Sequence, residues 1–256
     1  TSELAEASVF DRHLLQRATA SGATLHRQMV TGVFTDEARP RLRCADGSEN
    51  TYDLVVVASG INSTLINIIE ESGCGFKRPQ GLKSFVSEFR VGRQFVEQTL
   101  ATAMHVFLLD IPRLQFAAII PKGEFVTLVM LGDNLDEQLV EAFVNTQEDK
   151  SCFPGGRVPA NICQCFPRLN EFHARRPYDD RLVFIGDAGV SRLYKDGIGS
   201  AYRTAKAAAN CVALHGISRR DFKRHYWRAC RSIVYDNAIG RLVFSFCHII
   251  QKTQFM

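Results

Sequence analysis

Several features that mark a specialised class of protein are missing from this sequence. Its net charge is only +4, from 31 Lys and Arg against 27 Asp and Glu, which is too small for a protein that binds nucleic acid through a basic surface. No uninterrupted apolar run reaches the roughly 18 to 20 residues that a membrane-spanning helix needs. The motifs of serine hydrolases, HExxH metalloproteases and P-loop enzymes are also missing. We therefore expect no nucleic-acid partner and no hydrolase or nucleotide triphosphatase chemistry.

Cysteine is present, but its distribution is typical neither of a disulfide-stapled protein nor of a zinc protein. The eight cysteines are spread over 256 residues, of which 46% are hydrophobic, and no signal peptide is evident. Such a chain can bury its own core, so we expect reduced thiols and a cytoplasmic location. The spacing of Cys152, Cys163, Cys165 and His173 matches none of the usual zinc patterns, so we predict no metal site.

The first part of the sequence indicates a helix followed by short strands. Residues 8–20 carry apolar side chains at helical spacing, and Ser21-Gly22 supplies a stop. Extended stretches are expected at residues 25–33 and 41–44, and Asp46-Gly47 is a hairpin-type turn before the next strand.

Two apolar runs far apart in the chain predict a buried parallel sheet. Residues 54–58 are rich in valine and end at Ser59-Gly60, and residues 182–185 end at Gly186-Asp187. Continuous runs of this kind are typical of strands that are buried on both faces of a parallel sheet. We expect the two strands to lie parallel, so that Gly60 and Asp187 line one crevice.

Between these two runs the pattern changes to repeated β segments. Proline and glycine fall at the expected turns, Pro112-Arg113 and Pro121-Lys122-Gly123, because proline presets φ and glycine tolerates positive φ. A helix is expected at about residues 136–144. We therefore predict an inserted antiparallel sheet that covers the crevice, with strands at residues 85–91, 105–111, 116–120 and 125–131.

The strongest functional signal is the segment 181–205, which reads RLVFIGDAGVSRLYKDGIGSAYRTA. A strand that ends in Gly-Asp at the carboxyl edge of a sheet places the Asp187 carboxylate where open α/β sheets bind ligands, and a sugar-alcohol hydroxyl suits it. The helix that begins near Gly199 directs free N–H groups and its positive dipole end toward a pyrophosphate or an electron-rich flavin edge.

This segment resembles the flavoprotein hydroxylases and reductases related to p-hydroxybenzoate hydroxylase and geranylgeranyl reductase. In that family the Gly-Asp motif binds the ribityl chain of FAD, and a Gly-x-Gly ten residues after the aspartate opens the helix beside the pyrimidine end of the flavin. The turn in DLVVVASGINS, residues 53–63, is similar to a second family motif that approaches the cofactor. The resemblance implies these cofactor-binding residues: Ala58, Ser59, Gly60, Gly186, Asp187, Ala188, Gly197, Ile198, Gly199 and Ser200.

The sequence also departs from the family pattern. Ser59 replaces the usual aspartate, and Tyr194-Lys195-Asp196 stands where the family usually has a proline, in the loop that would face the flavin. The family's GxGxxG turn, which binds the ADP half of FAD, has no counterpart in these 256 residues. We therefore expect a truncated flavoprotein that holds FAD weakly or not at all.

The resemblance predicts an α/β (α+β) fold, in which a partial Rossmann-like FAD-binding domain carries an inserted antiparallel β substrate domain. We assign the FAD-binding domain to residues 1–80 and 151–216, the substrate domain to residues 81–150 and the C-terminal helices to residues 217–256. The implied function is an FAD-dependent oxidoreductase with NAD(P)H as electron donor and a small hydrophobic substrate. Its catalytic residues stay unassigned.

Two classes of function stay open at this point, an FAD-dependent enzyme and a cofactor-free module. Within the enzyme class, two reactions are considered. Reduction of an isoprenoid-like double bond is slightly favoured over aromatic hydroxylation, because residues 116–132 are similar to the substrate-domain hairpin of geranylgeranyl reductases. The alternative is a cofactor-free, catalytically inactive interaction module that keeps the flavoprotein fold. Purified protein with a yellow colour would favour the enzyme.

The C-terminal region adds an expectation about partners. It carries a capping box, Ser218 with Asp221, an apolar stretch at residues 242–250 and a basic stripe. The stripe is interpreted first as a solvated helix face, and its functional alternatives are an anionic membrane surface, reached by peripheral contact, or a partner protein. It consists of Arg219, Arg220, Lys223, Arg224, Arg228 and Arg231.

Overall fold

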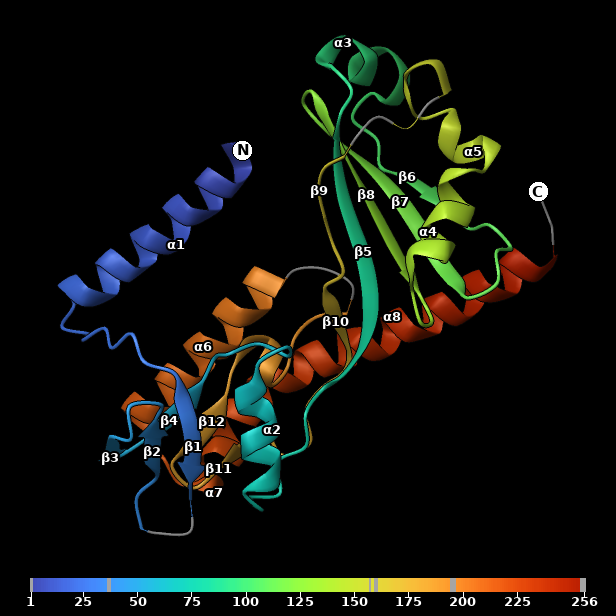
Figure 1. Ribbon diagram of the computed structural model, residues 1–256. Helices are drawn as coiled ribbons and strands as arrows, with labels where there is room; N and C mark the ends of the chain where they lie inside the picture. The colour runs from blue at the N-terminus through green and yellow to red at the C-terminus, as the bar shows by residue number, and fades with distance from the viewer. Residues whose placement is uncertain (1, 36–37, 157, 159–160, 194–196, 254–256) are drawn as a thin grey trace.

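The structure is a computed structural model that describes residues 2–35, 38–156, 158, 161–193 and 197–253. Two lobes are joined by the long strand β5 (Gln80–Arg90) and by the C-terminal helix α8 (Trp227–Thr253), both of which extend from one lobe to the other (Figure 1). The N-terminal helix α1 (Ser2–Ala20) projects from the lower lobe. The fold is mixed α/β, as the sequence predicted.

The centre of the lower lobe is a three-stranded sheet in the order β11-β12-β4. Strand β4 (Val55–Val57) and strand β12 (Leu182–Phe184) pair in parallel, which confirms the prediction made from their apolar runs. Strand β11 (Tyr178–Asp179) pairs with β12 in the antiparallel sense. Helix α2 (Thr64–Glu71) packs against this sheet, and its Ile66 and Ile69 are fully buried in the same core as the two central strands.

A second three-stranded sheet lies beside this centre. It consists of β1 (Val30–Phe34), β2 (Arg41–Cys44) and β3 (Glu49–Thr51), all antiparallel. Gly47 has a φ of 83°, so the hairpin turn expected at Asp46-Gly47 uses the conformation that glycine tolerates. The first strand begins at Val30, so the extended stretch expected from residue 25 starts five residues too early.

The upper lobe contains a six-stranded antiparallel sheet, and the predicted strand segments are confirmed as parts of it. Along the main path the order is β10-β5-β8-β7-β6, and β9 also pairs with β5. The strands not yet defined are β6 (His105–Phe107), β7 (Leu114–Lys122), β8 (Phe125–Gly132), β9 (Asn161–Cys165) and β10 (Arg168–Phe172). Strands β9 and β10 belong to this sheet but lie within residues 151–216, which we assigned to the FAD-binding domain.

Two details of this sheet differ from expectation. Pro121 lies inside β7, opposite Val126, and the β7–β8 turn falls at Gly123-Glu124, because Gly123 supplies the positive φ of 64° that a tight hairpin needs. The strand expected at residues 105–111 ends at Phe107. Helical turns also interrupt the span, at α3 (Arg93–Phe95) and the π-helical turn Val96–Leu100.

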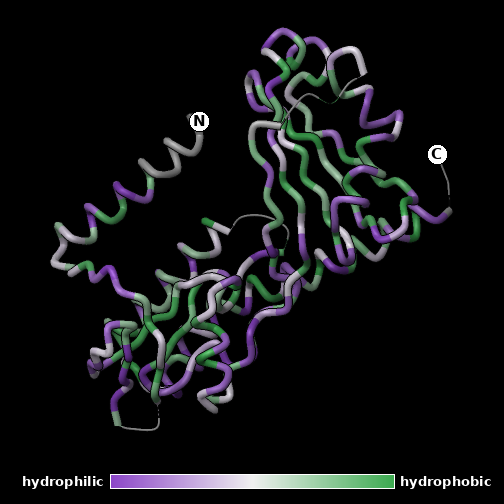
Figure 2. Tube along the Cα trace, in the orientation of Figure 1, coloured by the Kyte–Doolittle hydropathy of each residue, from purple (hydrophilic) through white to green (hydrophobic). Residues whose placement is uncertain are grey.

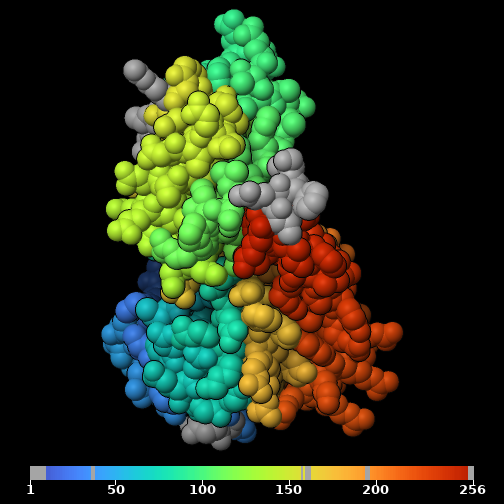
Figure 3. Space-filling model, turned by 90° about the vertical axis from the view of Figure 1, so that its right-hand side faces the viewer, coloured from blue at the N-terminus to red at the C-terminus, as the bar shows by residue number. Residues whose placement is uncertain are grey.

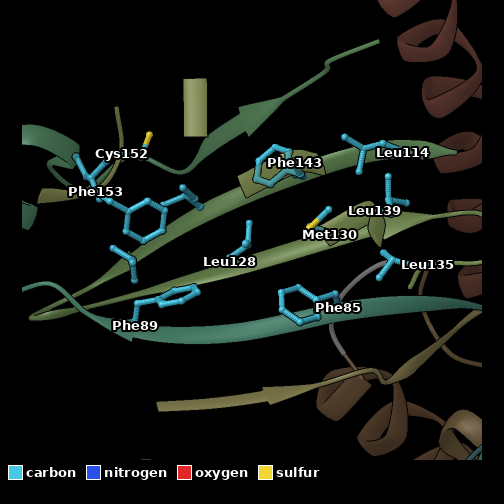
Figure 4. Packing of buried hydrophobic residues seen from close by; sticks show 14 of the residues in the cluster. Phe85, Phe89, Leu114, Leu128, Met130, Leu135, Leu139, Phe143, Cys152 and Phe153 are labelled. Carbon is cyan, nitrogen blue, oxygen red and sulfur yellow. The ribbon is translucent and has the colours of Figure 1, made fainter. Parts of the chain in front are cut away.

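Short helices cover one face of the upper sheet and complete its core. Helix α4 (Glu137–Val144) matches the predicted helix and is capped by the Asp136 carboxylate, and it is followed by α5 (Gln147–Lys150) and the 3-10 turn Pro154–Gly156. Figure 4 shows Leu139 and Phe143 packed over side chains from β5, β7 and β8.

Helix α6 (Gly197–Leu214) follows the loop after β12. After a short break, the C-terminal segment forms a single long helix. The capping box of Ser218 and Asp221 is confirmed, and it opens α7 (Arg219–Asp221), which runs through the π-helical turn Phe222–Tyr226 into α8. In the described residues this continuous helix, Arg219–Lys252, is long and apolar enough to cross a membrane by length and composition alone. The sequence predicted helices at residues 217–256, but not that they join into one continuous helix of this length.

Candidate functional site

The ends of β4 and β12 define the candidate site. Val57 lies opposite Phe184 in the parallel register, and the Ile185 N–H donates to the Val57 carbonyl at 3.0 Å. The Ser59-Gly60 and Gly186-Asp187 turns therefore leave the sheet at the same carboxyl edge. Gly60 has a φ of 73°, and a Cβ built there would meet nothing within 4 Å, so the backbone at this turn borders open space.

Gly186 brings the strand end against helix α6. Its φ is 58°, and a Cβ at this position would lie 3.3 Å from the Cβ of Ala201. Its N–H donates to the Thr204 hydroxyl at 2.8 Å, and that hydroxyl donates in turn to the Ser200 carbonyl at 2.8 Å. Glycine is needed here both for the positive φ and for the close contact between strand and helix.

The Asp187 carboxylate faces the first residue of α6. A Cβ built on Gly197 would lie 4.0 Å from its Oδ2 atom. The backbone carbonyl of Asp187 accepts a hydrogen bond from Asn170 Nδ2 at 3.0 Å, whereas no described residue donates to its carboxylate. The carboxylate is half-buried and lies at the positive dipole end of an 18-residue helix. It can accept hydrogen bonds from a hydroxylated ligand at this position.

The other residues of the predicted site divide into exposed and buried groups. Ile198 is 76% exposed, and Ala58 and Ser59 are also exposed. Ser200 is fully buried, and its hydroxyl accepts from the Arg192 N–H at 3.0 Å, so it supports the loop before α6. Ala188 is buried in the lower core. The flavin-facing loop expected at Tyr194, Lys195 and Asp196 lies outside the described residues.

Sequence reasoning missed the side chains that hold the site together. Asn237, on α8, donates from Nδ2 to the Ser191 carbonyl at 2.8 Å and accepts the Leu193 N–H at 2.8 Å, which fixes the loop between Asp187 and Gly197. Its signal in the sequence is a polar residue on a helix face that otherwise carries Tyr226 and Ile233.

Two sizeable hollows of the described surface lie away from this edge. One of about 670 Å³ lies between β1 and α2, and another of about 550 Å³ lies between α8 and the upper sheet. Asp187 and Gly60 line neither hollow.

The cysteines considered as zinc ligands do not form a shared site. Cys163 and Cys165 are exposed on β9 whereas Cys152 is buried, and in the described part of the chain no cluster of three or more His, Cys, Asp or Glu could hold a metal ion.

Comparison with known proteins supports a flavoprotein fold. No protein-family model and no curated protein matches the sequence. Among solved structures, a variant of the flavin-dependent brominase Bmp2 matches with a TM-score of 0.70 and 18% identity, over 96% of this chain and 67% of its own. The flavin-dependent halogenase BrvH from Brevundimonas sp. BAL3 matches with a TM-score of 0.61 and 17% identity, over 89% of this chain and 45% of its own.

A third similar structure is the tetracycline destructase Tet(51). It matches with a TM-score of 0.55 and 15% identity, over 85% of this chain and 61% of its own. The chain thus spans less than two thirds of this protein and of BrvH. At such identities the likeness concerns the fold alone: the chain has the fold of flavin-dependent oxidoreductases, a partial Rossmann-like lobe with an inserted antiparallel sheet.

Proposed function

We propose that the chain belongs to an FAD-dependent oxidoreductase that acts on a small hydrophobic substrate. The observation that carries the proposal is the Asp187 carboxylate, which has no partner among the described residues and lies at the carboxyl edge of the parallel strands, beside the start of α6. A bound flavin would supply the redox chemistry.

The residues at this edge fit the flavin half of FAD. Asp187 would accept hydrogen bonds from the ribityl hydroxyls, and the N-terminus of α6 would lie beside the pyrimidine end of the ring and stabilise negative charge there. Glycine at position 197 leaves space in front of the carboxylate, since a Cβ would come within 4.0 Å of Oδ2. The Ser59-Gly60 turn would approach the same ligand from the neighbouring strand.

For the reaction itself, we propose oxygen-dependent chemistry, with NAD(P)H as the electron donor. The sequence favoured a reductase slightly, on the resemblance of residues 116–132. The flavin-dependent halogenases among the similar structures now support the monooxygenase-like alternative. Turnover of the substrate by flavin-loaded protein with NADPH under anaerobic conditions would distinguish the two, because a reductase passes the electrons to the substrate without oxygen, whereas a monooxygenase requires oxygen.

The cofactor-free module is the rival interpretation, since Ser59 replaces an aspartate and no GxGxxG turn occurs in the sequence. FMN tests it on this chain, because FMN contains the ring and the ribityl chain without the adenosine half. We expect weak FMN binding in an absorbance titration and about a tenfold to hundredfold loss in Asp187→Ala, because a hydrogen bond to a charged group contributes about 1.5–3 kcal/mol.

Glu71→Ala is the matched control, because Glu71 is an exposed carboxylate of the same lobe on α2 and lies away from the edge. Its FMN affinity should equal that of the unmodified chain. Absence of FMN binding, or equal loss in both variants, would favour the cofactor-free module.

A further inference from the structure

The long helix Arg219–Lys252, here called the C-terminal helix, has an inner face that is fastened to both lobes. Asn237 bonds to the loop after β12, and the Tyr226 hydroxyl donates to the Phe184 carbonyl in the lower lobe. Gln251 Nε2 donates to the Gln115 carbonyl of the upper sheet at 2.7 Å. The buried residues of the inner face are Phe222, Tyr226, Cys230, Ile233, Asn237 and Gln251.

The opposite face of this helix is apolar and open. Its large apolar side chains are between 49% and 64% exposed, namely Tyr235, Ile239, Leu242, Val243, Phe246, Ile249 and Ile250. At about 100° per residue these positions fall within an arc of about 120°, on the side of the helix away from the buried residues. In the space-filling view, the orange and red atoms, which include this helix, lie on the right-hand side of the lower half of the molecule (Figure 3). Contiguous apolar surface of this kind marks an interaction site.

The same face carries positive charge in the first third of the helix. Arg224, Arg228 and Arg231 fall within the arc of the apolar residues by the same angular count, and all three are exposed. No ion pair to them occurs within the described part of the chain. The two acidic residues of the helix are already engaged, since Asp221 caps α7 and Asp236 pairs with Arg192 at 2.6 Å. The outer face is therefore cationic at one end and apolar over the rest.

We propose that this outer face binds the surface of an anionic lipid bilayer. The arginines would contact lipid phosphates, and the apolar side chains, including Tyr235 and Phe246, would enter the boundary between headgroups and acyl chains. The helix lies on the bilayer and does not cross it, because its inner face is bonded to both lobes through Asn237 and Gln251. Lipid is favoured over a protein partner because the face joins uncompensated positive charge to apolar surface, the combination that anionic membranes attract.

Vesicle co-sedimentation tests the proposal. The probes are vesicles of phosphatidylcholine alone and of phosphatidylcholine mixed with anionic phosphatidylglycerol. We expect binding to the mixed vesicles that is at least about tenfold tighter than to phosphatidylcholine and that weakens as salt is raised. Combining Arg224→Glu with Arg228→Glu should reduce binding by at least about tenfold, and Phe246→Ser should reduce it several-fold.

The matched controls lie in the upper lobe, away from the C-terminal helix. Lys122→Glu reverses an exposed charge at the β7–β8 hairpin, and Met104→Ser removes an exposed apolar side chain. Both should bind the mixed vesicles like the unmodified chain. Failure to bind, equal binding to both kinds of vesicle, or a dimer in size-exclusion chromatography that Phe246→Ser dissociates would overturn the proposal. The dimer would identify a second copy of the chain as the occupant.

Discussion

The two glycines that flank the Asp187 site have different functions. Gly186 combines a φ of 58° with a 3.3 Å approach to Ala201, whereas Gly197 is a helical residue that only borders the carboxylate. Gly186→Ala should therefore lower the free energy of unfolding by about 1–2 kcal/mol, from the left-handed conformation alone. Gly197→Ala should leave the stability unchanged or raise it by up to about 1 kcal/mol, because alanine favours a helix.

The pair separates folding from binding when stability and flavin affinity are measured together. Urea denaturation should detect only the Gly186→Ala defect, and flavin titration should show weaker binding by Gly197→Ala, whose methyl group enters the space before Asp187. If Gly197→Ala binds flavin like the unmodified chain, the ligand does not approach this end of α6.

Asp149 is a buried carboxylate whose two oxygens have no hydrogen-bond partner among the described residues. Burial raises its pKa from 3.8 to about 7. Because the folded-state pKa lies above the unfolded one, the folded protein favours the protonated acid. The contribution of Asp149 to the free energy of unfolding is therefore largest below about pH 4, and it is lost as the pH rises through about 7.

Asp149→Asn should remove this pH dependence, because the amide cannot ionise. Urea unfolding at about pH 5 and about pH 8 should show that the substitution stabilises the protein more at the higher pH. A gain of equal size at both values would show that Asp149 does not titrate in this range. Glu148→Gln, a neighbouring exposed carboxyl, is the control and should change neither value.

At the scale of elements, α8 positions the loop that connects Asp187 to α6. Asn237→Ala would leave the Ser191 carbonyl and the Leu193 N–H without their buried partner, which costs about 1–3 kcal/mol of unfolding free energy. Ser232→Ala, on the exposed face of the same helix, should cost much less. Flavin affinity should also fall in Asn237→Ala, and unchanged stability would show that the loop is held by other contacts.

Local sequence patterns predicted the elements that form the candidate site. Apart from the pairing of β4 with β12, contacts between segments far apart in the chain were not predicted. The runs at β4 and β12 were recognisable because strands of a parallel sheet are buried on both faces and lack alternation. The pairing of β5 with β8, and of β9 and β10 with β5, was not predictable, since partners far apart in the chain are chosen by tertiary packing. Asn237 was missed for the same reason, because its backbone partner lies 46 residues away.

The C-terminal region shows a similar limit. The capping box gave the start of the long helix correctly, because it is a local signal. The exposure of its apolar residues was not predictable, because the amphipathic pattern does not reveal which face packs against the lobes. In Figure 2, hydrophobic and hydrophilic residues alternate along this helix.

At the scale of the whole molecule, the sheet of the lower lobe has an edge beside the candidate site with which no described strand pairs. Strand β4 is the last strand of its sheet, and Val56 at its centre is 46% exposed. This edge can accept a further strand, and the described residues contain no glycine-rich turn for the ADP half of FAD. On the proposed function, the lobe would supply contacts to the flavin and ribityl half alone.

FAD affinity in two versions of the protein tests the central claim most directly. One is the chain of 256 residues, and the other is extended upstream to include a GxGxxG segment. We predict weak or undetectable FAD binding by the first and tight binding by the second, because the pyrophosphate and adenosine contacts contribute several kcal/mol and about 1.4 kcal/mol is a tenfold change in affinity. Equally tight binding by the shorter chain, or no binding by the longer one, would contradict the account.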